Sequence, residues 1–120
     1  MDDYEKIISV EESDNYIKLK FIGEMTIYTA AQIKEELVAI NSILVNGKNN
    51  ISINVSGVSD FDTSGLQLLM MAKKNLVLID KNVNIIGHSD SVIEAMRLYK
   101  MDGQMESASY DDEVIQALAG

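Results

Sequence analysis

Residues 51–74 read ISINVSGVSDFDTSGLQLLMMAKK and join two apolar segments through a short polar stretch. Ile51, Ile53 and Val55 alternate with polar residues, a pattern that predicts a half-buried β-strand. The apolar run from about Ser64 to Leu76 predicts a helix. Residues 60–65 between them hold two acids, two hydroxyls and a glycine. This stretch is therefore a helix cap, a functional site, or both.

Two strands are predicted before this stretch, over residues 5–12 and 15–22, with a hairpin turn at Ser13-Asp14. Gly23-Glu24 is expected to end the second strand. A helix is expected from about 30 to 45, capped by Thr29 and ended by Gly47. Its predicted buried face holds Ile33, Leu37, Ile40 and Leu44, and its predicted polar face holds Lys34, Glu35 and Glu36.

After this stretch, a strand is predicted over 82–87, a helix over 91–101, a short strand over 105–109 and a helix over 111–118. Strands that alternate with helices predict an α/β fold with a mixed, mostly parallel sheet. The opening hairpin adds an antiparallel edge, and the helices are expected mainly on one face. We expect residues 1–120 to form a single domain, with residues 1–4 and the last two fraying.

Composition excludes several classes of function. The chain has no cysteine and a single histidine, His88, which excludes thiolate and multi-histidine metal sites. Its formal net charge of −9 argues against nucleic acid and favours partners with a basic surface. No leader or membrane-spanning segment is expected, because Lys73 and Lys74 interrupt the longest apolar run. We expect a soluble, cytoplasmic protein without a cofactor or metal.

The polar stretch suggests a phosphorylation switch at Thr63 or Ser64. Capping by Asp62 or Thr63 would stabilise the helix by about 1 kcal/mol, but it explains only one of these residues. Residues 58–65 follow a predicted parallel strand, where α/β sheets place their binding sites. A phosphorylated hydroxyl gains about −1.5 to −2 charges, which the start of a helix tolerates. Asp60, Asp62 and a docked protein would not tolerate that charge.

Three segments together resemble the STAS domain family, whose members include bacterial anti-sigma factor antagonists. Residues 53–74, within the stretch quoted above, are similar to the family's apolar strand, its V-x-x-x-D-[ST]-[ST]-G-L pattern and its apolar helix. FIGEMTIYTAAQIKEEL (21–37) resembles its G-E-L segment, with Gly23, Glu24 and Met25 in those positions. NVNIIGHSDSVIEAMRLYKMDG (82–103) resembles its closing strand and helix. The resemblance covers nearly the whole chain.

The resemblance implies that Thr63 is the phosphate acceptor and that Ser64 takes the second hydroxyl position. It implies that the unmodified form binds a kinase-type anti-sigma factor, that this kinase disables it, and that a phosphatase restores it. The residues expected to bind the partner are Asp62, Ser64, Gly65, Glu24, Thr26, Tyr28 and Thr29. Asp62 would set the loop, Ser64 and Gly65 would give close backbone access, and the others would extend the surface.

One departure leaves the branch of the family open. The simplest antagonists usually carry serine at the acceptor position, where this chain carries Thr63. The stretch TIYTAA (26–31) also resembles chemotaxis-associated STAS modules and the small STAS subunit of lipid-transport ABC systems. In those proteins the loop can serve as a docking surface without phosphorylation, which is the alternative function.

Enzymatic and phosphorelay functions fit the residues poorly. A phosphorelay receiver needs an acidic pair after its first strand to hold Mg²⁺, and this chain offers only Glu24 there. A hydrolase would need a base such as His88, but G-x-S-x-G is absent. A phosphate-binding G-x-x-x-x-G-K-[ST] loop is absent as well. We therefore expect a protein-binding module and no enzyme, in which His88→Ala would retain binding.

Overall fold

The computed structural model describes residues 5–98. In chain order the elements are β1 (Ile8–Glu12), β2 (Tyr16–Met25), α1 (Ala30–Ala39), α2 (Asn41–Asn46), β3 (Asn50–Phe61), α3 (Thr63–Leu78), β4 (Asn82–Ile86) and α4 (Asp90–Leu98). The strand predicted over 105–109, the helix over 111–118 and the end of the helix over 91–101 lie outside the described residues.

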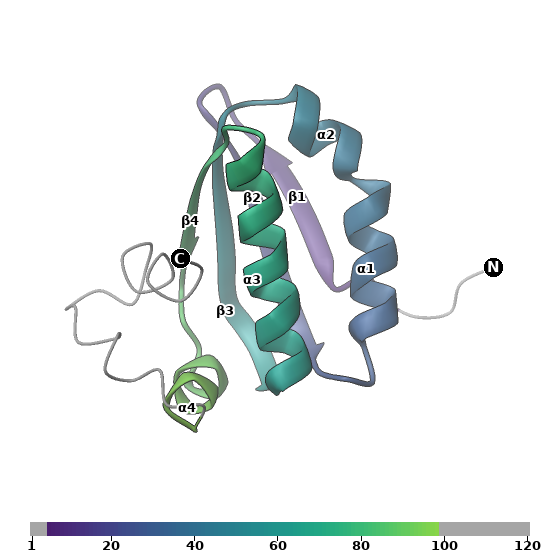
Figure 1. Ribbon diagram of the computed structural model, residues 1–120, viewed down its shortest axis with the longest axis vertical. Helices are drawn as coiled ribbons and strands as arrows, with labels where there is room; N and C mark the ends of the chain where they lie inside the picture. The colour runs from purple at the N-terminus through teal and green to yellow at the C-terminus, as the bar shows by residue number, and fades with distance from the viewer. Residues whose placement is uncertain (1–4, 99–120) are drawn as a thin grey trace.

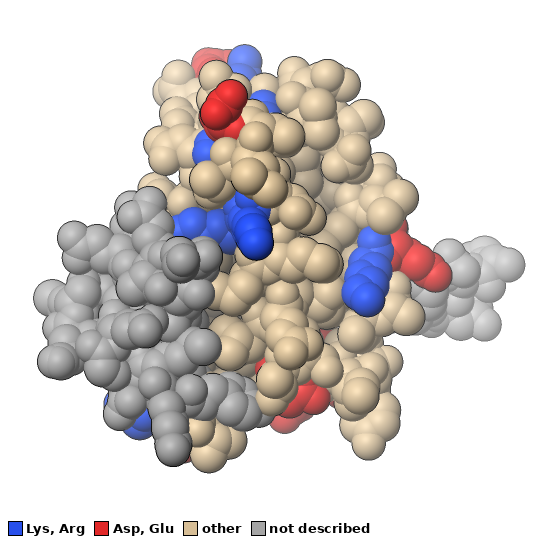
Figure 2. Space-filling view, viewed as in Figure 1, with Lys and Arg blue, Asp and Glu red and all other residues tan. Residues whose placement is uncertain are grey.

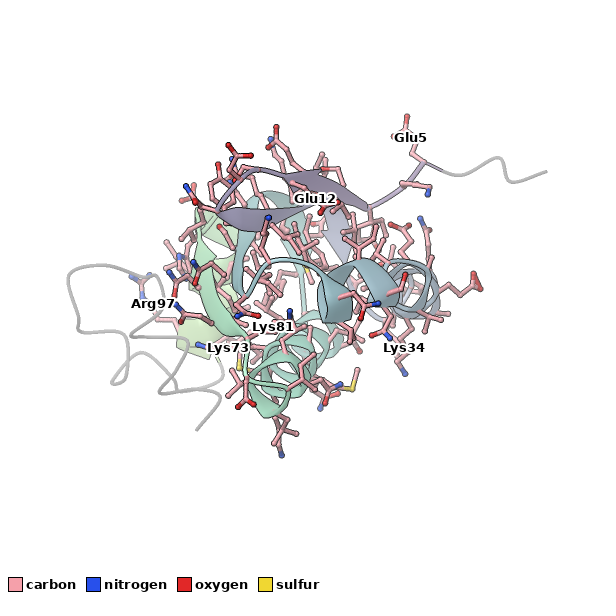
Figure 3. The ribbon with its side chains drawn as sticks, turned by 90° about the horizontal axis from the view of Figure 1, so that it is seen from above. Glu5, Glu12, Lys34, Lys73, Lys81 and Arg97 are labelled. Carbon is pink, nitrogen blue, oxygen red and sulfur yellow. The ribbon has the colours of Figure 1, made fainter. Side chains whose placement is uncertain are left out.

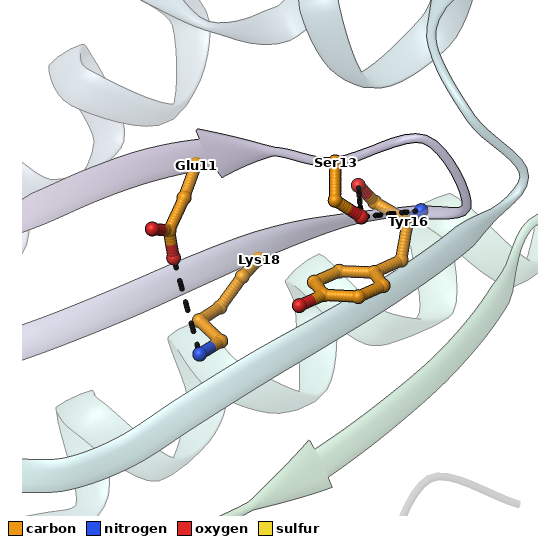
Figure 4. A network of polar contacts seen from close by, with 4 residues as sticks. All are labelled: Glu11, Ser13, Tyr16 and Lys18. Carbon is orange, nitrogen blue, oxygen red and sulfur yellow. Dashed lines mark hydrogen bonds and ion pairs between the residues drawn. The ribbon is translucent and has the colours of Figure 1, made fainter.

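The strands form one sheet in the order β1-β2-β3-β4 (Figure 1). β1 pairs with β2 antiparallel, whereas β2–β3 and β3–β4 pair in parallel. The predicted α/β fold with an antiparallel edge is confirmed. Ser13 closes the hairpin: its hydroxyl accepts from the Tyr16 amide at 3.2 Å and donates to the Tyr16 carbonyl at 3.3 Å (Figure 4).

The two faces of the sheet differ in polarity. Side chains that alternate along the central strands, such as Ile17, Leu19 and Ile53, are fully buried. They face α1 and α3, which Figures 1 and 3 show on the same side of the sheet. The intervening positions, such as Lys20 and Ser52, are exposed or half-buried. The expectation that helices lie mainly on one face is confirmed. The physical reason is that only one face of the sheet is apolar enough to need covering.

β2 and β3 are longer than predicted, and the prediction that Gly23-Glu24 ends β2 is wrong. Gly23 stays within the strand at φ +90°, a conformation that glycine adopts at little cost. The pairing Lys20↔Asn54 is followed by Ile22↔Gly57, so β3 carries an extra residue there, and register shifts again after Gly23. These bulges let β3 continue through residues 58–61, which were predicted as loop.

The helix predicted over 30–45 is divided in two. Ile40, at φ −101° and ψ 5°, leaves helical geometry, and α2 begins at Asn41. Asn and Ser favour the start of a helix over its interior, so Asn41-Ser42 suit this break. Gly47 does end α2. A side chain would not fit at this position, because a Cβ would lie 2.5 Å from the Ile43 carbonyl oxygen.

Two charged side chains are buried where they join elements. Glu36, expected on the polar face of its helix, is buried instead, and Oε1 accepts from the amides of Ile7 at 3.0 Å and Ile8 at 2.7 Å. A buried carboxylate needs hydrogen-bond donors, and these two amides supply them. The same hydrogen bonds hold the start of β1 against α1. Lys81 points into the protein in Figure 3, and its Nζ donates to the carbonyl oxygen of Gly47 at 3.1 Å.

Within residues 5–98, no helix has the length and apolar character needed to span a bilayer. Lys73, which was expected to interrupt an apolar run, does so from a buried position in α3.

Candidate functional site

The carboxyl ends of the three parallel strands lie along one edge of the sheet. Met25 at the end of β2 pairs with Phe61 at the end of β3. At the same edge, the Ser91 hydroxyl of α4 donates to the Ser59 carbonyl of β3. The turn at 26–29 and the start of α3 therefore meet, although more than thirty residues separate them in the sequence.

Asp62 connects these two segments. One carboxylate oxygen, Oδ1, accepts from the Gly65 amide at 3.1 Å and caps α3. The other, Oδ2, accepts from the Ile27 amide at 3.1 Å. The Asp62 amide donates to the Met25 carbonyl at 3.3 Å. Of the two expected capping residues, Asp62 is the cap, and the same side chain also holds the neighbouring turn. We call this pair of hydrogen bonds the Asp62 clasp.

Gly65 is buried where α3 approaches the end of β2. A Cβ on Gly65 would lie 2.2 Å from the Met25 carbonyl oxygen, closer than any contact allows. Its φ is not in the left-handed region. The conformational freedom of glycine is therefore not what this position requires. Gly65 is needed because any side chain would push α3 away from β2.

The turn at 26–29 is held by its own hydroxyl groups. Thr29 Oγ1 accepts from the Thr26 amide at 3.0 Å and donates to the Glu24 carbonyl at 2.9 Å. Thr26 Oγ1 accepts from the Tyr28 amide at 3.2 Å and donates to the Glu24 carboxylate. Thr29 stands at the cap position of α1 but makes no side-chain cap hydrogen bond, contrary to prediction. Its hydroxyl is used to fix the turn instead.

Exposure divides the predicted partner-binding residues. Thr26 is buried, Glu24 and Thr29 are half-buried, and Tyr28 is 88% exposed. Ile27, which sequence reasoning did not single out, is 67% exposed. Two large apolar side chains therefore project from a turn that hydrogen bonds hold in place. An isoleucine beside a tyrosine in a predicted loop was the available signal.

Thr63 is the first residue of α3 and is exposed, while Ser64 is half-buried. The carboxylates of Asp60 and Asp62 come directly before them in the chain, and Glu24 joins the same edge of the sheet through its pairing with Asp60. Among residues 5–98, no group of three His, Cys, Asp or Glu side chains could hold a metal ion. The geometry presents an accessible hydroxyl at a helix start beside two exposed apolar side chains.

Residues 8–115 match the family model described as "Mlab, STAS domain". This chain belongs to the STAS domain family. The predicted family resemblance is confirmed, and it spans the sheet, the turn at 26–29 and the start of α3.

Relatives of this STAS protein carry names that state a regulatory role. The chain is 30% identical over 96 residues to an anti-sigma-B factor antagonist of Staphylococcus aureus, covering 80% of this chain and 83% of that protein. It is 32% identical over 79 residues to one of Staphylococcus epidermidis, covering 66% of this chain and 70% of that protein. Proteins named as anti-sigma-B factor antagonists are thus among its relatives.

Solved structures share the fold of this STAS domain. An anti-sigma factor antagonist from Mycobacterium paratuberculosis superimposes with a TM-score of 0.64 at 18% identity, covering 94% of this chain and 93% of that one. The STAS domain of an antagonist from Rhodobacter sphaeroides gives 0.57 at 20% identity, covering 70% and 91%. At these identities the likeness is one of fold.

Proposed function

We propose that this STAS domain is an anti-sigma factor antagonist switched by phosphorylation of Thr63. The unmodified form binds a kinase-type anti-sigma factor in the cytoplasm and so frees a sigma factor. The same kinase phosphorylates Thr63 and ends binding, and a phosphatase restores it. The observation that carries this proposal is the exposed Thr63 at the start of α3, next in sequence to the residue that clasps the exposed turn.

Electrostatics explains why this hydroxyl suits a switch. A phosphate would bring about −1.5 to −2 charges to the amino end of α3, where the helix dipole and free amides favour an anion. The fold would therefore accept the modification. A partner surface that rests on a neutral hydroxyl would instead have to bury an unpaired dianion, which costs several kcal/mol unless a cation compensates.

Asp62 provides a second effect of the phosphate. Its carboxylate holds both the Gly65 amide and the Ile27 amide at 3.1 Å. A phosphate on Thr63 would repel this carboxylate and compete for the amides that start α3. Weakening the clasp would release the turn that carries Ile27 and Tyr28. We infer that phosphorylation both adds charge and loosens the apolar contact.

The experiment is a binding measurement with the purified kinase-type anti-sigma factor of the same organism. Thr63→Ala should bind and resist phosphorylation, whereas Thr63→Glu should lose binding at least tenfold. Ser64→Ala is the matched control and should still be phosphorylated. Mass spectrometry of protein from cells should locate phosphate on Thr63. If both Thr63 variants bind like the parent and no phosphothreonine is found, the switch is wrong.

Docking without phosphorylation is the second candidate function. It is favoured by the turn at 26–29, whose hydrogen bonds fix an apolar contact surface without any modification. In this case the partner is a chemotaxis-associated protein or a lipid-transport ABC system. Tyr28→Ala would then abolish binding, while Thr63→Ala and Thr63→Glu would leave it unchanged. A neighbouring gene for a histidine-kinase-like ATPase would favour the switch instead.

A further inference from the structure

An open groove runs between α1 and α3 and begins beside the proposed phosphorylation site. Its first part, of about 200 Å³, is lined by Ser64, Gln67 and Ala30 among others. Its second part, of about 310 Å³, is lined mainly by apolar side chains of α1, α2 and α3. Lys34 and Met71 line both parts, so the two parts are adjacent. α1 and α3 lie side by side in Figure 1.

The groove leaves apolar side chains in contact with solvent. Val38 is 76% exposed and Met71 is 42% exposed, and both line it. Leu37, Leu44 and Leu76 form the apolar lining beneath them. Exposed apolar surface of this kind, rimmed by polar residues, is typical of a protein-binding site.

The charge of the groove is opposite to that of the chain. The sequence holds 19 acids and 10 basic residues, yet among residues 5–98 Lys34 is the charged residue that lines the groove, and no acid of this part of the chain lines it. Within residues 5–98, Lys34 makes no ion pair. Figure 2 shows this face as mostly tan, with blue groups near its centre and on its right side, the latter beside a red group. The groove is therefore suited to bind a partner surface that is apolar and carries a negative charge.

We propose that this groove binds an amphipathic helix of the partner protein. Apolar side chains of that helix pack against Leu37, Val38 and Met71, and one of its carboxylates pairs with Lys34. A helix is the occupant because α1 and α3 satisfy their backbone groups internally and offer no edge for strand pairing. The groove reaches Ser64, so the helix would end next to Thr63. This binding mode rests on the proposed function for its biological role, but its chemistry can be tested without the partner.

The test uses the whole chain, labelled for NMR, and synthetic amphipathic peptides of about 16 residues, which span about 24 Å as a helix. One peptide carries leucines on one face with a flanking glutamate, a second replaces that glutamate by lysine, and a third is a scramble. The acidic peptide should shift the amides of residues 34, 37, 38 and 71, with affinity about threefold above the lysine peptide. The scramble should produce no such localised shifts.

Two matched variants make the result specific. Lys34→Glu should reverse the preference between the acidic and the lysine peptide. Lys48→Glu changes the net charge equally but lies outside the groove, so it should leave the preference unchanged. The proposal is wrong if both variants act alike, or if the acidic peptide shifts amides elsewhere. It is also wrong if the groove amides shift with protein concentration alone, because the occupant would then be a second copy.

The result is separable from the fate of the proposed function. Peptide binding in the groove together with no binding of the kinase-type anti-sigma factor would support the groove and contradict the proposed function. Binding of that factor that Lys34→Glu leaves unchanged, together with no peptide binding, would contradict the groove alone.

Discussion

At the scale of single residues, Asp62 joins the start of α3 to a turn that lies 35 positions earlier in the chain. Each of its carboxylate oxygens accepts one backbone amide, from Gly65 and from Ile27. A carboxylate that accepts a backbone N–H group at a helix start stabilises that helix. Because this residue directly precedes Thr63, the proposed switch would act on the turn through charge on the threonine.

We predict that Asp62→Ala lowers the free energy of unfolding by about 2 kcal/mol, because it removes a helix cap and leaves the Ile27 amide without its acceptor. Urea denaturation followed by circular dichroism measures this loss. Asp60→Ala is the control, since that side chain is exposed and caps no helix. An equal loss in both variants would show that the clasp contributes little.

We predict that Gly65→Ala destabilises the protein by about 1–3 kcal/mol, because the new methyl group would collide with the Met25 carbonyl oxygen and force α3 outward. Thermal unfolding measures the change. Gln67→Ala, at an exposed position two residues further along α3, should change stability by less than about 0.5 kcal/mol. If Gly65→Ala is as stable as the parent, the close approach of α3 to β2 is wrong.

At the scale of elements, the spacing of the apolar residues along β3 indicates where its bulges lie. Ile51, Ile53 and Val55 follow each other at steps of two, but Val58 comes after a step of three. Phe61, which pairs with Met25, comes after another step of three. Each such step coincides with a register shift against β2, so the extra residue returns the next apolar side chain to the helix-covered face. A strict period of two predicts only the first half of this strand.

The attachment of β1 to α1 gives a prediction for elements. Glu36→Gln should destabilise the protein by about 1–3 kcal/mol, because an amide replaces the charged acceptor of the Ile7 and Ile8 amides. Hydrogen exchange at these two amides should accelerate more than exchange in β3. Glu35→Gln, its exposed neighbour on the same helix, should have little effect. Equal acceleration across the sheet would mean that β1 is not held locally.

At the scale of the whole molecule, hydrophobic burial rather than ion pairing holds the fold. Between residues 5 and 98, Lys18 and Glu11 form an ion pair at 3.9 Å, with side chains that are 34% and 74% exposed. Exposed pairs of this kind contribute little to stability. A net charge of −9 in so small a chain also makes the compact state repel itself.

Salt should therefore stabilise this protein. Raising NaCl from low concentration to physiological ionic strength shortens the Debye length to about 8 Å and screens the excess negative charge. The melting temperature should rise, by about 4–8 °C for each kcal/mol gained. Calorimetry over a NaCl series measures it. A falling melting temperature would show that attractive charge pairs outweigh the repulsion.

Local sequence determined most of the elements of this protein. Apolar periods, the hairpin turn, the cap at Asp62 and the glycine after α2 depend on neighbouring residues, so they could be predicted. The mixed sheet followed from the alternation of strands and helices, and the family from motifs at 21–37, 53–74 and 82–103. Thr63 as the phosphate acceptor followed from the family pattern and stays a prediction.

Only the tertiary structure decided which distant residues meet. The contact of Asp62 with Ile27, the burial of Glu36 against β1 and the close approach of Gly65 to Met25 join segments far apart in the chain. No periodic pattern records such contacts, because they depend on how the strands are ordered and where their ends lie. The groove between α1 and α3 arises for the same reason, since two helices shape it only after both pack on one face of the sheet.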